Sequence, residues 1–216
     1  MKILLGDPRH DTVGTHSSYV PINIGYIATY LTKMIPDSNL DIKIATQTKE
    51  IFDLIETWKP DVIGLSNYVW NSTLSNRMCE IAKEINPDIL SILGGPEFPA
   101  GTGSRKIQDT ERDQTYTKSL NYLKERPAVD YYAYSDGEVV FFEIIKDFIK
   151  KNNSVKEMKK DDKPFKGCAS LSNNKEVLLI GDYIPRLGMD GSLKIPIRII
   201  MSFYALNKVI EILNYS

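Results

Sequence analysis

The chain has 216 residues, of which 42% are hydrophobic and 25% are charged, as is usual for a globular protein with one ordinary domain. Its 27 basic and 28 acidic side chains leave a formal net charge of -1, which predicts no basic surface for nucleic acids or anionic membranes. Its two cysteines, Cys79 and Cys168, form no CxxC pair and no CxxxCxxC motif. The N-terminal apolar run is too short for a signal peptide, so we expect a soluble cytoplasmic protein with reduced thiols.

Strand-like and helix-like patterns alternate along the first 151 residues. Unbroken apolar runs predict strands at 2–6, 41–46, 61–66, 88–93 and 129–135. Helical spacing of apolar residues predicts helices at 24–35, 49–58, 71–85 and 137–151. Several of the predicted strands follow a helix through a proline, which ends the helix. Because the strands are apolar on both faces, we predict a doubly wound α/β domain over 1–151, Rossmann-like or flavodoxin-like, with a mainly parallel five-stranded sheet.

The other segments differ from this pattern. The polar stretch 100–127 interrupts the alternation and is predicted to be a surface insertion with a modest helical pattern near its end. Lysine-rich residues 152–163 predict a solvated linker, and 167–182 alternate around Asn173-Asn174 as in a β-hairpin. We therefore divide the remainder into a linker and hairpin connector, 152–187, and an atypical tail, 188–216.

Four loops are the candidate site, because ligands of an open parallel sheet bind beyond the carboxyl ends of its strands. These loops are residues 7–19, 66–71, 94–98 and 135–138. The second loop contains two aromatic residues and two asparagines, the third a double glycine, and the fourth two carboxylates around a glycine. We expect all four to converge on one edge of the sheet.

Each feature also has a purely structural interpretation. Gly94 and Gly95 could form a tight turn that needs positive φ. Asn71 could cap the following helix, and the pair of Asp136 and Glu138 could favour a helix N-terminus. The aromatic residues of the second loop could pack under the insertion. The residues alone leave these alternatives open.

No catalytic or metal-binding constellation is evident from spacing. The histidines, His10 and His16, both lie in the first loop, where a histidine could bind a metal or simply be exposed. The GTGSRK stretch at 101–106 fits neither GxxxxGK[ST] nor GxGxxG. We therefore expect no catalytic residue in this chain.

Four stretches together carry a family resemblance: PINIGYIATYL at 21–31, DVIGLSNYVWN at 61–71, SILGGPEFP at 91–99 and VDYYAYSDGEVVFFEII at 129–145. In this order and at these intervals they resemble the N-terminal cobalamin-binding domain of B12-dependent radical SAM proteins, over residues 1–187. The resemblance implies that the nucleotide tail of a corrinoid enters a slot in the domain, while the corrin ring lies over the carboxyl ends of the strands.

The resemblance also implies a set of binding residues. The cofactor-binding candidates are Ser66, Tyr68, Trp70, Asn71, Gly94, Gly95, Glu97, Ser135, Gly137 and Glu138. His10 is the candidate lower ligand of cobalt, although the loop reads GDPRHDTVG and differs in spacing from the DxHxxG motif of methionine synthase and the mutases.

The predicted function is cobalamin binding, and hence metal ion binding through cobalt. Because no CxxxCxxC motif for a [4Fe–4S] cluster is found, we expect a truncated relative that lacks the iron–sulfur catalytic half and is not catalytic alone. The parent family implies methyltransferase-like chemistry and a radical SAM domain as partner, in trans or in a full-length parent. Two alternatives are a ligand-free α/β interaction or regulatory module and a flavodoxin-like domain for flavin or nucleotide.

Overall fold

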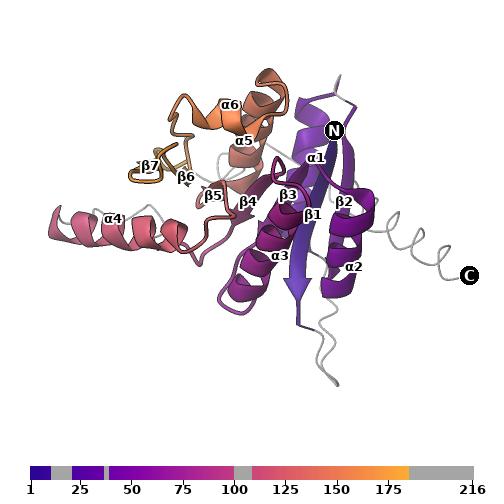
Figure 1. Ribbon diagram of the computed structural model, residues 1–216, viewed down its shortest axis with the longest axis horizontal. Helices are drawn as coiled ribbons and strands as arrows, with labels where there is room; N and C mark the ends of the chain where they lie inside the picture. Colours follow the sequence, from indigo (N-terminus) through magenta and orange to yellow (C-terminus); the bar gives the residue numbers. More distant parts are fainter. Residues whose placement is uncertain (11–20, 37–38, 100–108, 185–216) are drawn as a thin grey trace, which may run out of the picture.

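A computed structural model describes residues 1–10, 21–36, 39–99 and 109–184 (Figure 1). The strands are β1 (Lys2–Arg9), β2 (Asp41–Gln47), β3 (Val62–Ser66), β4 (Leu90–Gly94), β5 (Tyr131–Ala133), β6 (Cys168–Leu171) and β7 (Leu178–Ile180). The helices are α1 (Ile22–Met34), α2 (Thr48–Asp53), the π-helical turn η1 (Leu54–Trp58), α3 (Ser72–Ile85), α4 (Asp109–Lys124), α5 (Gly137–Lys150) and α6 (Val155–Lys159).

All seven strands belong to one sheet, in the order β2-β1-β3-β4-β5-β6-β7. The first five are parallel, which confirms the predicted doubly wound α/β fold. The predicted hairpin is also confirmed, and its strands β6 and β7 extend the sheet in antiparallel orientation. The chain reverses its direction of winding between β1 and β3, so the carboxyl ends of these strands mark the switch point of the fold.

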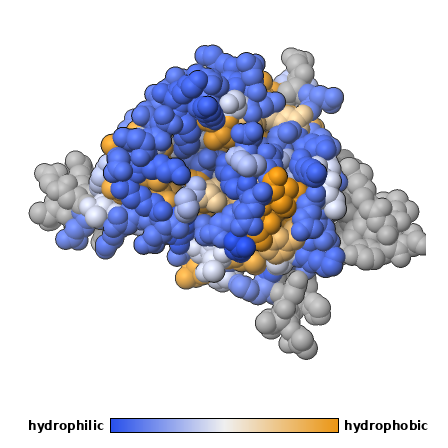
Figure 2. Space-filling model, in the orientation of Figure 1, coloured by the Kyte–Doolittle hydropathy of each residue, from blue (hydrophilic) through white to orange (hydrophobic). Residues whose placement is uncertain are grey.

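The sheet separates two apolar cores because successive side chains of a strand point to opposite faces. On one face Leu4 and Ile63 pack with the buried residues of α2, η1, α3 and the end of α4. On the other face Ile3 and Leu5 pack with α1, α5 and α6. The surface shown in Figure 2 is mostly hydrophilic, with hydrophobic areas between the polar side chains. Among the described residues, no helix is both long and apolar enough to span a membrane.

Three predicted boundaries or faces differ from the structure. Strand β1 continues through the first predicted loop residues to Arg9, which pairs with Gln47 after a break in register. The predicted strand 129–135 is paired only over the three residues of β5. The helical spacing of apolar residues over 71–85 also predicts Ile85 on the inner face of α3, but this side chain is 40% exposed. Instead Ser75 and Cys79 are buried beside Met78, because small side chains let this helix approach the sheet closely.

Two segments that were predicted to be peripheral contribute to the core. The insertion contains α4, whose Tyr122 and Leu123 are buried against the sheet. The lysine-rich stretch is not simply a solvated linker, because it contains α6 with Met158 buried in the second core. Its Lys159 donates a hydrogen bond of 2.7 Å to the carbonyl oxygen of Asp130, and burial lowers the pKa of this lysine. Hydrophobic periodicity is detected only over longer windows, so it could not indicate a helix as short as α6.

Candidate functional site

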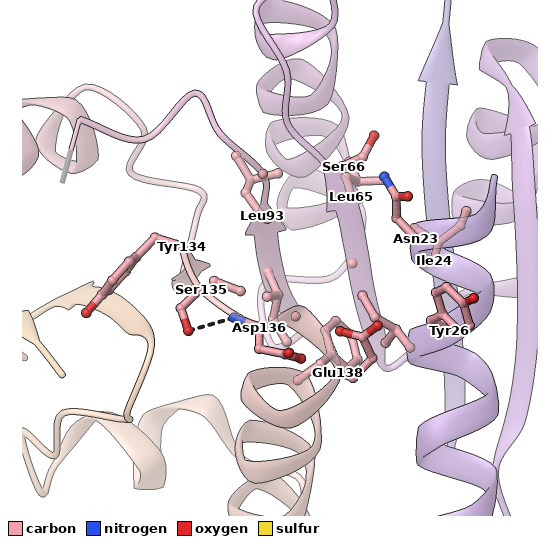
Figure 3. Close-up of a pocket in the computed structure, with 18 of the residues that line it drawn as sticks. Asn23, Ile24, Tyr26, Leu65, Ser66, Leu93, Tyr134, Ser135, Asp136 and Glu138 are labelled. Carbon is pink, nitrogen blue, oxygen red and sulfur yellow. Dashed lines mark hydrogen bonds between the residues drawn. The ribbon is translucent and has the colours of Figure 1, made fainter. Parts of the chain in front are cut away.

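A pocket of about 570 Å³ opens at the carboxyl ends of the strands, between the N-terminal parts of α1 and α5 (Figure 3). Its size is typical of ligand-binding sites. Helix α1 contributes Asn23, Ile24, Tyr26 and Ile27. The strands and the loops after them contribute Leu5, Gly64, Leu65, Ser66, Tyr68, Ile92, Leu93, Gly94, Gly95, Pro96, Ala133, Tyr134, Ser135 and Asp136. Helix α5 contributes Gly137, Glu138 and Phe141, and the C-terminal connector contributes Tyr183.

The inner part of the pocket is apolar and its opening is polar. Leu5, Ile92 and Phe141 are between 1% and 2% exposed and belong to the core on the α1 and α5 face. Ser135 and Glu138, near the opening, are partly exposed. Such a pocket suits a ligand with a flat apolar end and a polar remainder.

The two adjacent glycines have different physical reasons to be glycine. Gly95 has φ +141°, and a Cβ on it would overlap the carbonyl group of Asn67, with the carbonyl carbon 3.0 Å away. Gly95 is therefore required by the fold itself, as the turn interpretation proposes. A Cβ on Gly94 would meet only Ala133, at 3.5 Å and 3.6 Å, which is ordinary contact. The missing side chain of Gly94 thus leaves room in the pocket without being needed for packing.

Ser66 is the centre of a buried polar network below the second loop. Its hydroxyl donates to Asp7 Oδ1 at 2.5 Å and accepts from Asn71 Nδ2 at 3.1 Å. Asn71 Oδ1 in turn accepts from the backbone N–H of Tyr68 at 2.8 Å. Asn71 occupies the N-cap position of α3, but its side chain makes no capping hydrogen bond. Asn71 instead fixes the loop that carries the two aromatic residues.

Tyr68 and Trp70 form a stacked pair beside the opening, with ring centroids 4.5 Å apart. Trp70 is 56% exposed, so it is not buried under the described part of the insertion, residues 109–127. The Tyr68 hydroxyl accepts a hydrogen bond of 2.5 Å from the Asn23 amide of α1. Burial, followed by the nearby Asp7 carboxylate, raises the pKa of Tyr68. The pair therefore presents an aromatic surface that α1 and the second loop hold in place.

The sequence did not indicate Asn67 as a site residue, although it holds the loop that contains Gly95. Its amide nitrogen donates to the hydroxyls of Tyr122 at 2.6 Å and Tyr132 at 3.0 Å. Tyr132 donates to the carbonyl oxygen of Gly95 at 3.2 Å, and Phe98 stacks on the same ring at 4.6 Å. Burial raises the pKa of Tyr132 far above its ordinary value. Only an asparagine directly after an apolar strand could have signalled this role.

The C-terminal connector is tied to the opposite side of the opening. The Ser135 hydroxyl donates to the carbonyl oxygen of Ile184 and accepts from its N–H, both at 3.1 Å. Tyr134 donates from its hydroxyl to the carbonyl oxygen of Gly181, and burial raises the pKa of Tyr134 to about 12. These bonds bring Tyr183 into the lining. The sequence did not indicate this contact.

The structure thus brings most of the predicted site residues to one pocket. The lining includes Ser66, Tyr68, Gly94, Gly95, Ser135, Gly137 and Glu138. Trp70, Asn71 and Glu97 lie in the adjoining loops outside the lining. Asp136 and Glu138 occupy the N-cap and first turn of α5, where the helix dipole favours acidic groups. Both interpretations of these two carboxylates are therefore compatible with the structure.

No metal cluster of three or more His, Cys, Asp or Glu side chains occurs in the described part of the chain. His10 directs its Nε2 at the carbonyl oxygen of Trp70. Its role as a cobalt ligand stays a prediction, and His16 lies outside the described residues.

Comparison with known proteins finds similarity to cobalamin-related proteins. Residues 13–107 match the model of the B12 binding domain. The chain is 27% identical over 132 residues to the cobalamin-dependent radical SAM methyltransferase TokK of Streptomyces tokunonensis, covering 59% of this chain and 17% of that protein. It is 29% identical over 86 residues to 2-(S-pantetheinyl)-carbapenam-3-carboxylate methyltransferase of Streptantibioticus cattleyicolor, covering 40% of this chain and 10% of that protein.

A third relative is the anaerobic magnesium-protoporphyrin IX monomethyl ester cyclase of Rubrivivax gelatinosus, which is 25% identical over 150 residues, 67% of this chain and 24% of the cyclase. The chain therefore spans less than a quarter of the length of each of these relatives. Within its α/β domain, residues 13–107 are therefore similar to the B12 binding domain.

Proposed function

We propose that this chain binds cobalamin and that the nucleotide tail of the cofactor occupies the pocket between α1 and α5. The observation that carries the proposal is the pocket itself. It lies at the carboxyl ends of the strands, and Gly94 leaves room in it that packing does not require. Most of its lining lies within the segment that matches the B12 binding domain.

The chemistry of the pocket suits the tail of cobalamin. The tail ends in a flat aromatic base and connects to the corrin through a ribose and a phosphate. The buried side chains of Leu5, Ile92 and Phe141 would surround the base. Polar groups near the opening, including Ser135 and Asn23, would face the sugar and phosphate. The match between an amphipathic ligand and a graded pocket supports the assignment.

The corrin ring would lie over the strand ends, outside the pocket. Tyr68, Trp70 and Asn71 would border it on one side, and residues 135–138 would border it on the other. The exposed, stacked ring of Trp70 supports this placement, because a flat macrocycle can cover such a surface. Glu97 lies in the same loop as Gly95, residues 94–98, and would lie near the same edge.

When bound, cobalamin supplies the organometallic chemistry of its cobalt, while the chain supplies binding and position. The name of one relative, TokK, associates cobalamin with a radical SAM methyltransferase. We therefore propose a radical SAM domain as partner, in trans or within a longer parent protein. In this proposal the chain alone is not a catalyst.

The test compares hydroxocobalamin with cobinamide, which keeps the corrin but lacks the base, ribose and phosphate. Equilibrium dialysis against the full chain should give at least about tenfold weaker binding of cobinamide, because the pocket interactions are lost. FMN serves as the control for a flavodoxin-like function. No retention of hydroxocobalamin at high micromolar concentration, or tight retention of FMN, would refute the proposal.

A further inference from the structure

We propose that the pocket also selects the base at the end of the corrinoid tail, preferring a methylated benzimidazole to a purine. This inference rests on the proposed function, because it assumes that the tail enters the pocket. Corrinoids that share the same ring differ mainly in this base, so the chemistry of the inner pocket decides which of them fits.

The inner end of the pocket offers only hydrocarbon side chains. Leu5 and Ile92 are each 1% exposed, and Phe141 is 2% exposed. Between them lies Gly64, where an added Cβ would be 2.9 Å from Cζ of the Phe141 ring. The phenyl ring therefore lies directly over the backbone of Gly64 and closes the apolar end.

The backbone groups at the inner end of the pocket belong to paired strands of the sheet. Leu5 pairs with Ile44 on one side and with Gly64 on the other, and Gly64 pairs with Ile92. Backbone N–H and C=O groups that form the sheet ladder are not free to pair with a ligand. A polar edge of a base at this end would lose its hydrogen bonds to water without replacing them.

Several polar side chains nearer the opening already have partners. The Ser66 hydroxyl bonds Asp7 and Asn71, the Tyr68 hydroxyl accepts from Asn23, and Ser135 bonds Ile184. Figure 3 shows Asn23, Ile24 and Tyr26 on one side, Tyr134 to Asp136 on the other, and Leu65, Ser66 and Leu93 between them. The two carboxylates, Asp136 and Glu138, lie at the start of α5, before Phe141 along the helix. Glu138 is partly exposed and Asp136 is 7% exposed, and both precede the part of α5 at which Phe141 closes the apolar end.

The two kinds of base respond differently to such a pocket. The two methyl groups of dimethylbenzimidazole gain from apolar burial. The exocyclic amine and ring nitrogens of adenine would be buried without partners, which is unfavourable. We therefore expect the chain to bind cobalamin about tenfold to a hundredfold more tightly than the corrinoid with adenine as its lower base.

One substitution should reduce this preference. Ile27 of α1 lines the pocket and lies across from the start of α5, since its Cδ1 would be 3.4 Å from a Cβ on Gly137. Ile27→Gln places an amide donor and acceptor on a longer, flexible side chain in the lining, which can extend toward the inner end and pair with adenine. The matched control is Ile22→Gln, on the same helix but 48% exposed and not part of the lining.

The experiment measures competition between cobalamin and the adenine corrinoid for the full chain, by equilibrium dialysis with detection of the visible absorption. The expected result is tighter binding of cobalamin by the wild type and by Ile22→Gln, with a preference at least about fivefold smaller for Ile27→Gln. Equal or reversed affinities in the wild type would overturn the selection while leaving cobalamin binding intact. An unchanged preference in a folded Ile27→Gln variant would also overturn it. Binding of neither corrinoid would instead refute the proposed function.

Discussion

Substitution of each of the two adjacent glycines by alanine should show which glycine the fold requires for its stability and which it does not. Gly95→Ala forces an L-residue to φ +141° and brings its Cβ against the carbonyl of Asn67. Asn67 cannot move easily, because its side chain bonds Tyr122 and Tyr132. Backbone strain of this kind and the required shift together should lower the free energy of unfolding by about 2–4 kcal/mol.

Gly94→Ala is the matched control, since its Cβ would make only ordinary contacts with Ala133 at 3.5 Å and 3.6 Å. A glycine at the end of a strand has more backbone freedom to lose than alanine, so this variant should be unchanged or stabilised by up to about 1 kcal/mol. Urea unfolding monitored by far-UV circular dichroism measures both values. Equal stability of the two variants would refute this division of roles, as would a Gly95→Ala variant as stable as the wild type.

Three further predictions concern pH, fluorescence and the connector. Burial raises the pKa of the Cys168 thiol from 9.0 to about 12, so the unfolded chain loses this proton first and stability should fall between pH 9 and pH 12. In the Cys168→Ala variant the free energy of unfolding, measured by chemical unfolding, should fall less steeply with pH than in the wild type, by up to about 1.4 kcal/mol per pH unit. Parallel plots of this free energy against pH for the two proteins would contradict the prediction. In a Trp58→Phe variant, cobalamin should quench most of the remaining emission from Trp70, which is 56% exposed; unchanged emission at saturation would place the corrin elsewhere. Ser135→Ala removes both bonds to Ile184 and should speed limited proteolysis near that residue, with Ser154→Ala as control; identical digestion rates would show that these bonds do not hold the connector.

The architecture could be predicted largely from hydrophobic patterns. Apolar strands alternating with helical periodicity indicated the parallel sheet, and the alternation around Asn173-Asn174 indicated the hairpin. Tertiary contacts determine the parts that differed. Strand β1 extends to Arg9 although its last residues are polar, because Asp7 joins the buried network with Ser66. Helix α3 turns Ile85 outward because small residues lie on its inner stripe.

The site could be predicted only from the rule that ligands bind beyond the carboxyl ends of parallel strands. That rule identified the loops around Ser66, Gly94 and Ser135, which do meet at the pocket. It could not identify Ile27 on α1, because this contact depends on how α1 packs beside α5. It also could not assign different roles to the two adjacent glycines. Only the φ of Gly95 and its distance to Asn67 show that the fold requires Gly95, whereas Gly94 leaves room in the pocket.

The most direct test of the account is cobalamin retention by the wild type and by Gly94→Val. Both proteins are loaded with hydroxocobalamin and passed through a gel-filtration column, and their visible spectra are then recorded. The account predicts that the wild type retains cobalamin in the base-off form, whereas Gly94→Val, with the same circular dichroism, loses it because the valine side chain fills the room left by Gly94. Equal retention by the two folded proteins, or no retention by the wild type, would contradict the account.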